Sequence, residues 1–437
     1  MPATIGTVDS AGTLSDILKE YYIGPLQEQL NNEVMVLELF EKAKISWAGK
    51  QAVVPVHVGR NTGVDFQAED ATLTAAVNQV VKRLTFTSAY LYGRFEVTGP
   101  AIAAAAKGGT ASFIGALELE MDKLKNDIRD RSNRTLTSGN RVAGFIHEKK
   151  APGGAADWEF RGDFPKLQKA LDEKTAAVAV RIVNNTNLVL NPGSTVAYEY
   201  VASAQNLNSI NAAAGTINLD TLDTSAVLGG IGMAVVISDT DPSLDYLDAE
   251  PEGIYRNLGY VDHFGVDRGA DEGDATELQS VVFSQSTDGT LGDTTEADMS
   301  LERIQQCFDA VMVTSGKEPN CMLMHPAQRA KYIGLLNGNI WSYSDKAQTG
   351  DGGFLGLSYG GVPIKTSRHV DNGIVVFMET SCWKLAVLED GKFANLDGNV
   401  LSRVAGKDNW EGFYKWYYNH YCHRPNANAV LTGLTLI

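Results

Sequence analysis

The stretch TASFIGALELEMDKLKNDIRDRSNRTLTSG, residues 110–139, decides how the rest of the chain is interpreted. Its apolar residues recur at steps of three and four and so fall along one stripe of a helix. They are Phe113, Ile114, Leu117, Met121, Leu124 and Ile128. Thr110 or Ser112 is suited to cap the start, and Gly139 to end the helix. At roughly 26 residues such a helix spans about 40 Å. The pattern therefore predicts one long, continuous helix that forms a rigid support for the rest of the fold.

The residues before this helix predict an extended ribbon. The run VVKRLTFTSAYLYGRFEVT, residues 80–98, alternates like a single strand about three times the usual length. A second alternating run, residues 45–58, contains Pro55, which confines that strand to an edge or an unpaired position. The polar residues 59–78 lie between the two runs and offer no core. Because a two-stranded ribbon is marginal in water, we expect it to pack on a neighbour.

Composition excludes several classes of protein. The chain has 437 residues, a formal charge of -16 and a pI near 4.9, which argues against a nucleic-acid reader because phosphate binding needs clustered cations. No apolar run approaches the length of a membrane span, and the first residues lack a secretion-signal pattern. The four cysteines form no CxxC pair, so buried thiols are expected rather than a zinc or redox motif. These features predict a cytoplasmic product.

The remaining segments alternate between helical and strand patterns. Thr13 is placed to cap a first helix, and a second amphipathic helix is expected from Leu26 to about Glu41. Short strand runs separated by Asn, Gly and Pro turns suggest a small β unit at about residues 170–240. From Met299 onward, helices and buried strands alternate as in an α/β region.

This order of parts resembles tailed-bacteriophage major capsid proteins with the Hong Kong 97-type capsid fold. The resemblance implies an α+β fold with an N-terminal arm, a long extended β-hairpin loop, a spine helix, a peripheral sheet, an axial domain and an inserted small β domain. The expected ranges are the arm at 1–45, the extended loop at 46–107, the spine helix and first peripheral part at 108–169, the inserted β domain at 170–240, the axial domain at 241–368, and the return to the peripheral or axial sheet at 369–437.

The resemblance also implies a function. It predicts a major capsid protein that self-assembles into the icosahedral shell around the double-stranded DNA genome of a tailed bacteriophage. The expected partners are other copies in hexamers and pentamers, together with portal, scaffold and possible decoration proteins. Contact with packaged DNA is expected to be only non-specific, and no membrane partner is expected. The expected location is the virion, after assembly in the bacterial host cytoplasm. No enzyme activity, catalytic residue, cofactor or metal is implied.

Two clusters carry side chains of the kinds found in functional sites. The loop with Asp262, His263, Asp267, Asp271, Glu272 and Asp274 has carboxylates that suit a hard cation, but it lacks EF-hand spacing, so a solvated acidic loop is favoured. His325 precedes Pro326 at a strand-to-helix junction with Cys321 nearby, and a Cys/His pair is conceivable there. A capped helix start is the favoured interpretation.

Three further features have plain structural interpretations. GGIGMA, residues 229–234, is followed by no helix and so predicts a strand entry rather than a dinucleotide site. The aromatic tail of residues 410–421 could stack bases or sugars, but its alternation and few cations favour a sheet core or subunit contact. Lys50 and Lys82 lie in the expected extended loop, where some family members form isopeptide bonds, but no motif fixes a bond partner here.

Two rival functions remain at this point. An encapsulin-type nanocompartment shell protein shares the fold, and neighbouring cargo genes would distinguish it from a phage protein. A metal-dependent hydrolase that uses the acidic loop belongs to a different class, but the sequence lacks a nucleophile and base constellation for it.

Overall fold

The structure is a computed structural model of the whole chain. The described residues are 35–43, 45, 47–61, 63–69, 72, 74–75, 78–100, 110–139, 142–149, 157–162, 164–173, 178–184, 205–219, 233–237, 249–259, 263–268, 276–284, 297–337, 357–394, 401–404 and 406–435. These residues fall into two compact units, which are described separately. The smaller unit comprises residues 88–133 and 387–418, and the larger comprises 35–87, 134–386 and 419–437.

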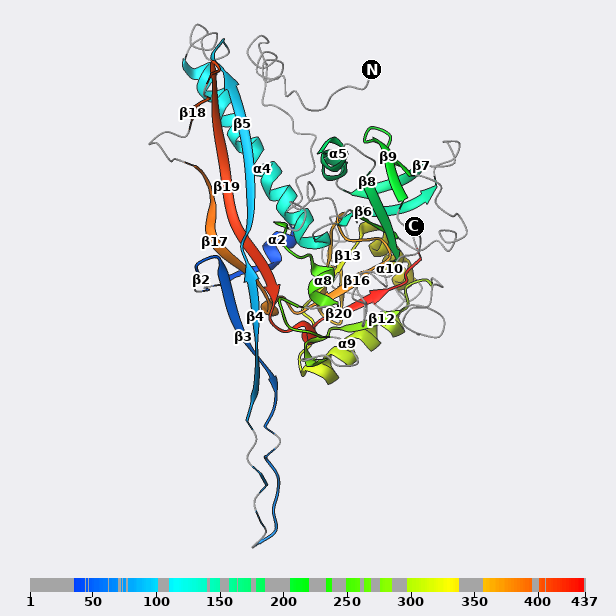
Figure 1. The fold of residues 1–437 in the computed structure, drawn as a ribbon. Helices are drawn as coiled ribbons and strands as arrows, with labels where there is room; N and C mark the ends of the chain where they lie inside the picture. Colours follow the sequence, from blue (N-terminus) through cyan, green and yellow to red (C-terminus); the bar gives the residue numbers. More distant parts are fainter. Residues whose placement is uncertain are drawn as a thin grey trace. The chain divides into compact units, whose positions relative to one another are not determined.

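The predicted long helix is confirmed. Helix α4 runs from Thr110 to Ser138, and Figure 1 shows it as one continuous helix. Gly139 ends it with a positive φ of 87°, and its N–H donates to Thr135 O over 2.8 Å. A Cβ on Gly139 would lie 2.4 Å from the Gly253 nitrogen, so the helix end also needs glycine for a close backbone approach.

The smaller unit is a sheet against the first part of α4. Strand β5 (Ala89–Thr98) pairs antiparallel with β19 (Asn409–Cys422), which also pairs with β18 (Ser402–Arg403) and β17 (Trp383–Phe393). Leu124 and Ile128 of α4 press on Gly93 so closely that a Cβ there would lie 2.5 Å from Ile128 Cδ1. Glycine at this position lets the helix lie directly on the strand.

The larger unit is centred on a six-stranded mixed sheet with the order β12-β20-β16-β13-β15-β14. The strands are β12 (Val281–Ser284), β13 (Cys321–Met324), β14 (Ser358–Tyr359), β15 (Val362–Thr366), β16 (Val375–Met378) and β20 (Ala429–Thr432). Every residue of β13, β16 and β20 is buried, which explains their continuous apolar runs. The C-terminal strand β20 therefore completes the middle of this sheet, between β12 and β16.

Helix α9 (Leu301–Ser315) buries one stripe of its surface in the core of this sheet. Ser300 caps its start by accepting the Arg303 N–H, and Gly316 ends it with a φ of 69°. Helix α10 (Pro326–Asn337) follows β13, as the α/β pattern predicted. The remaining short helices of the described residues are α8 (Ile254–Leu258), η2 (Thr276–Leu278), η4 (Thr380–Cys382) and η5 (Pro425–Ala427).

A closed barrel forms a second core in the larger unit. Its strand order is β10-β7-β6-β11-β8-β9, and helix α5 (Phe164–Glu173) packs on it. The strands are β6 (Val142–Lys149), β7 (Asp157–Gly162), β8 (Val178–Asn184), β9 (Gln205–Asn211), β10 (Thr216–Leu219) and β11 (Met233–Ile237). Four of these strands lie within residues 170–240, but β6 and β7 precede that range. The barrel needs both because β6 pairs with β11 and β7 pairs with β10.

The extended ribbon differs from its prediction at two points. Residues 80–98 form two strands rather than one, β4 (Val80–Thr87) and β5, separated at the buried Ser88. Only β4 pairs with the other ribbon strand, β3 (Gln51–Gly59), whereas β5 pairs with β19 (Figure 1). Because β4 and β5 pair with different strands, the extended run is interrupted between them. A short β2 (Trp47–Ala48) and a turn at Gly49, with a φ of 67°, precede β3.

The second predicted N-terminal helix ends earlier than expected. Its described part is α2 (Met35–Leu39), and Leu26–Val34 and the first predicted helix lie outside the described residues. After Phe40 the chain forms β1 (Glu41–Ala43), which pairs parallel with β17 from Lys384 to Ala386. This parallel pairing provides the tertiary contact that replaces the last predicted helical turn.

Candidate assembly surfaces

One face of the β3–β4 ribbon is anchored within the larger unit. Ala52, Leu84 and Phe86 are buried in a cluster with Val266, Leu278, Ala386 and Tyr421. The ring of Phe86 lies 5.1 Å from that of Tyr421, and the Thr85 N–H donates to Phe264 O over 2.9 Å. The base of the ribbon is thus held by both apolar packing and a backbone hydrogen bond.

The opposite face of the ribbon is open. Residues directly across an antiparallel pair share a face, and the register places Val53 beside Thr85, Pro55 beside Arg83, and His57 beside Val81. Val53 is 45% exposed and Val81 is 54% exposed, and Val64 and Phe66 farther along the ribbon are almost fully exposed. β-branched side chains favour a packed surface. The open face is therefore suited to contact another protein surface.

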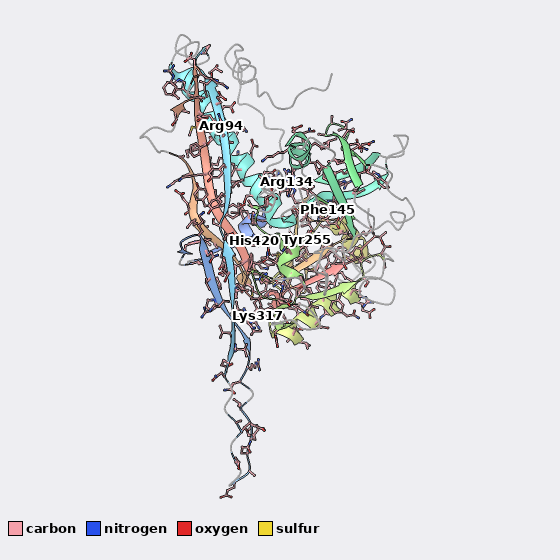
Figure 2. All side chains as sticks on the ribbon, in the orientation of Figure 1. Arg94, Arg134, Phe145, Tyr255, Lys317 and His420 are labelled. Carbon is pink, nitrogen blue, oxygen red and sulfur yellow. The ribbon has the colours of Figure 1, made fainter. Side chains whose placement is uncertain are left out.

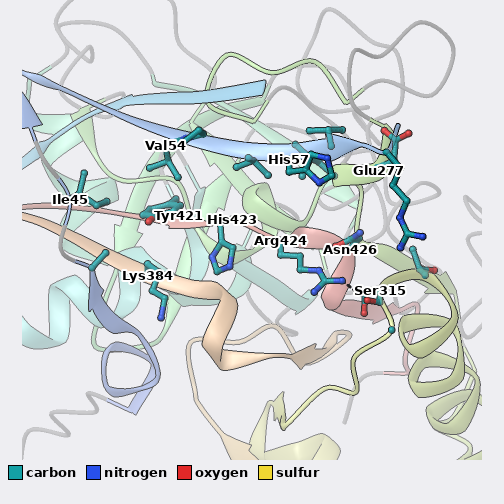
Figure 3. A pocket seen from close by; sticks show the side chains of 18 of the residues that line it. Ile45, Val54, His57, Glu277, Ser315, Lys384, Tyr421, His423, Arg424 and Asn426 are labelled. Carbon is teal, nitrogen blue, oxygen red and sulfur yellow. Dashed lines mark hydrogen bonds between the residues drawn. The ribbon is translucent and has the colours of Figure 1, made fainter. Parts of the chain in front are cut away.

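A groove of about 990 Å³ lies beneath the ribbon in the larger unit. Its apolar lining includes Ile45, Val54, Val56, Leu278 and Tyr421. Figure 3 shows Val54 and His57 of β3 on one side and Lys384, His423 and Arg424 on the other. The groove is thus part apolar and part cationic.

The charge of the groove is predominantly positive. Its described cationic lining residues are Lys42, Arg60, Lys384 and Arg424, and Glu277 is the acidic residue among the described lining residues. The hydrogen bond and charge of Lys384 lower the pKa of Glu41, a neighbouring surface carboxylate. Arg424 donates to the carbonyl of Ser315 at the end of α9 (Figure 3). A partner for this groove would combine apolar and acidic side chains.

The smaller unit presents an aromatic strand face. Tyr90 and Tyr92 of β5 are 43% and 56% exposed, and both rings contact Tyr417 of β19 edge-on. The Tyr92 hydroxyl donates to the Tyr417 hydroxyl over 3.0 Å, which contributes to the raised pKa of Tyr92. Arg94 on this face pairs with Glu411 at 2.6 Å. Tyrosine and arginine are enriched at protein interfaces.

The other face of β19 is a sheet core, as predicted for the aromatic tail. Tyr414, Trp416 and Tyr418 alternate along the strand and are all buried. The Tyr418 hydroxyl also shares a 2.6 Å hydrogen bond with Ser132 of α4. These aromatic rings are therefore enclosed and not available to stack on bases.

The acidic loop divides between described and undescribed residues. Asp262, Asp271, Glu272 and Asp274 lie outside the described residues. His263 is buried rather than solvated, and its Nε2 donates to Cys422 O over 2.9 Å. Burial and the neighbouring Arg268 hold its pKa well below the usual range. Within the described part of the chain, no group of three His, Cys, Asp or Glu side chains is arranged to hold a metal.

The His325 region has the geometry of a helix start. His325 Nδ1 accepts the Ala327 N–H over 3.2 Å at the beginning of α10. Cys321 is buried, and burial raises the pKa of its thiol to about 11, which disfavours the nucleophilic thiolate. All four cysteines are buried free thiols, as predicted.

The other candidate motifs contribute no site geometry. Met233 and Ala234 begin β11, in line with the predicted strand entry, and residues 229–232 lie outside the described residues. Lys50 lies in the exposed turn before β3, and Lys82 lies on β4 opposite Val56. No helix in the described ranges is long and apolar enough to cross a membrane.

The groove was missed by sequence reasoning because its walls come from distant segments. Ile45, Glu277, Ser315, Lys384 and Arg424 are separated by up to several hundred residues, and their local patterns predict only strands, a helix end and loops. The basic side chains of the groove are visible in the sequence, but such residues are common on any surface and do not indicate a groove.

Comparison with known proteins supports a fold assignment. No protein-family model matches the sequence, and no curated protein matches it. A chain of the cyanophage A-1(L) capsid asymmetric unit aligns over 95% of this chain and 97% of its own length, with a TM-score of 0.54 and 9% identity.

Two further solved structures are similar at lower scores. A capsid chain of a native GTA particle covers 95% of this chain and 96% of its own, at a TM-score of 0.46 and 10% identity. A chain from Gordonia phage Cozz aligns over 99% of this chain and 96% of its own length, with a TM-score of 0.43 and 12% identity. The assignment rests on the first structure: this chain has the α+β fold of a chain in the cyanophage A-1(L) capsid.

Proposed function

We propose that the chain is the major capsid protein of a tailed bacteriophage and self-assembles into the icosahedral shell around its double-stranded DNA genome. The observation that carries this proposal is the alignment with the cyanophage capsid chain over almost the whole length of both chains. A match over 95% of this chain and 97% of the other favours a shared architecture over one shared domain.

The surfaces described above provide the contacts that assembly requires. The ribbon has an open apolar face, and the groove beneath it is apolar and cationic. Because the chain carries a formal charge of -16, a second copy offers an excess of acidic side chains with which the cationic groove can pair. We assign these two surfaces, together with the Tyr90–Tyr92–Tyr417 face, to contacts between copies in hexamers and pentamers.

The same proposal covers partners and location. Portal, scaffold and possible decoration proteins are the expected partners besides other copies, and contact with DNA is expected to be non-specific. The protein would assemble in the host cytoplasm and remain in the virion. It would act by geometry rather than catalysis, with residues 1–45 as the arm, 46–107 as the extended loop, 170–240 within the inserted β domain and 241–368 as the axial domain.

The direct test is the mass of the purified chain under assembly conditions. Light scattering and negative-stain microscopy should detect closed particles of megadalton mass, with or without a co-expressed scaffold protein, rather than only the 47.1 kDa chain. Monomers or small dimers under every condition, with a folded chain by circular dichroism, would contradict the proposal.

A further inference from the structure

A second pocket, separate from the groove, lies in the larger unit where five segments of the chain meet. Its volume is about 380 Å³, within the range typical of small-ligand pockets. The end of α4, the barrel strands β6 and β7, the start of α10 and the turn after β15 all contribute to it. Its polar side chains are Arg134, Ser138, Arg161, His325, Arg368 and His369. Figure 2 labels Arg134 and Phe145, two of its lining residues.

Two glycines shape the barrel wall of this pocket. Gly144 of β6 lies opposite Gly162 of β7. A Cβ on Gly144 would lie 2.5 Å from Arg161 O, and a Cβ on Gly162 would lie 2.4 Å from Ala143 O. The two backbones approach too closely for any side chain at either position. At this pair the two strands meet backbone to backbone, and the side chains of Phe145 and Arg161 line the pocket from the adjacent positions.

The charged side chains around the pocket are all positive. Three are arginines, and none of the described residues that line it is acidic. Arg161 also contacts Glu159 on its own strand, at 3.2 Å and about half exposed, where such an ion pair is weak. Arg368 Nε donates to His369 Nε2 over 3.4 Å, which places these two side chains together in the turn after β15.

The start of α10 adds further donors and positive potential. His325 Nδ1 accepts the Ala327 N–H, so the neutral imidazole carries its proton on Nε2 and is a hydrogen-bond donor there. The amino-terminal end of a helix bears a partial positive charge, and α10 has 12 residues. Arginine forks, an imidazole donor and a helix start thus surround one small cavity.

We infer that this pocket is an oxyanion site that binds a phosphate group. A phosphate monoester carries about -1.5 to -2 charges and three acceptor oxygens at neutral pH. Three guanidinium groups from three separate elements match that charge and number of acceptors better than they match a single carboxylate. Free phosphate has this charge and number of oxygens, whereas a phosphodiester of the DNA backbone has one charge and two free oxygens and would make only part of these contacts. The inference does not depend on the proposed assembly function.

The test measures phosphate binding by the full-length folded chain. Inorganic phosphate should raise its melting temperature and bind with a measurable Kd by calorimetry at fixed ionic strength. Arg368→Gln should weaken binding about tenfold or more, because a hydrogen bond to a charged group is lost. Arg161→Gln, on the exposed edge of the pocket, is the second variant should Arg368→Gln fold poorly.

The matched control is Arg329→Gln, which removes an exposed arginine of α10 that does not line the pocket. Its Kd for phosphate should equal that of the unchanged chain. A loss of affinity equal to that of Arg368→Gln, or an equal melting shift from sodium chloride at the same ionic strength, would overturn the inference. A short DNA duplex that competes with phosphate would identify the backbone as the source, and binding of phosphate without competition would identify the free ion.

Discussion

The barrel and the ribbon are both built from antiparallel β-strands, yet the two regions bury the faces of those strands in opposite ways. The six barrel strands close on one another and enclose a core of their own, with Trp158, Phe160 and Val180 buried. The ribbon strands β3 and β4 are anchored on one face only and leave Val53 and Val81 exposed on the other. Closure removes free strand edges, whereas a two-stranded ribbon keeps them.

This difference suggests that the barrel and the ribbon have different roles, one in folding and the other in assembly. A closed barrel needs nothing outside itself, so its side chains should determine the stability of the chain. The outer ribbon contributes little to the core of its own chain, so its side chains should determine contacts between copies. If this division holds, the effect of a substitution on the free energy of unfolding should decrease from the barrel core to the open face of the ribbon.

The largest effect is expected from the barrel core. Phe160→Ala should lower the free energy of unfolding by about 3–5 kcal/mol, because Phe160 is 2% exposed and its removal leaves a cavity. Urea denaturation measures the loss. Hydrogen exchange should show faster exchange in β6 to β11 while β3 and β4 keep their protection. Equal loss of protection in the ribbon would show that the two regions are one cooperative unit.

A pH change should act on the region beneath the ribbon and spare the barrel. His420 is buried against the rings of Phe40 and Trp383, and burial lowers its pKa to about 3. The pKa of His263 is also lowered. No histidine occurs among the described residues of the barrel core. The unfolded chain therefore takes up protons below about pH 6.5 that the folded chain does not.

The lowered pKa values determine the direction in which the free energy of unfolding changes with pH. Stability from His420 is fully present above pH 6.5 and is lost as the pH falls from about 6.5 toward about 3, by up to ~1.4 kcal/mol per pH unit. His420→Gln should flatten the curve of unfolding free energy against pH in this window. Trp383→Phe, a neighbouring change that does not titrate, should shift the curve without changing its slope. An unchanged slope in His420→Gln would contradict the assignment.

Local sequence patterns predicted most elements because they depend on near neighbours. The period of three and four, with the terminal glycine, predicted α4 from Thr110 to Ser138, and the continuous apolar runs predicted β13 and β16. The break at Ser88 was not predicted, because β4 and β5 have the same alternation and differ only in their distant partners. Register and partner choice are tertiary properties.

The candidate surfaces were only partly predictable for the same reason. The open face of the ribbon follows from alternation and from Pro55, which the sequence shows. The groove and the phosphate pocket cannot be predicted from local patterns, because each is formed by segments that are distant in sequence and meet only in the folded chain. Arg134, Arg161 and Arg368 each occur in a different element, and no local pattern connects them.

A smaller effect on folding is expected from the end of the ribbon. Replacing Arg60–Asn78 with an Asn-Gly turn should change the free energy of unfolding of the unassembled chain by less than ~0.5 kcal/mol, because the described residues there are mostly exposed. Particle yield should fall sharply, since this segment offers Val64 and Phe66 to a neighbour. A variant that melts early as a monomer, or that forms normal shells, would place the subunit contact elsewhere.

The smallest effect on folding is expected when one methyl group is replaced by a hydroxyl at each of two valines on the open face of the ribbon. Val53 and Val81 are about half exposed, and threonine keeps their β-branched shape and strand preference. The double variant Val53→Thr with Val81→Thr should therefore unfold within about 0.5 kcal/mol of the unchanged chain.

The same double variant should raise the protein concentration needed for assembly. If a neighbouring copy covers this face, each hydroxyl must be desolvated in the shell without a designed partner, and each such group costs about 1–3 kcal/mol. Light scattering across a concentration series measures the threshold. Met312→Gln, a polar change at a 53% exposed methionine on α9 that does not line the groove, is the matched control and should leave the threshold unchanged. Equal thresholds in both variants would mean that the open face stays in solvent in the assembled particle, and that its valines serve the fold of the ribbon instead.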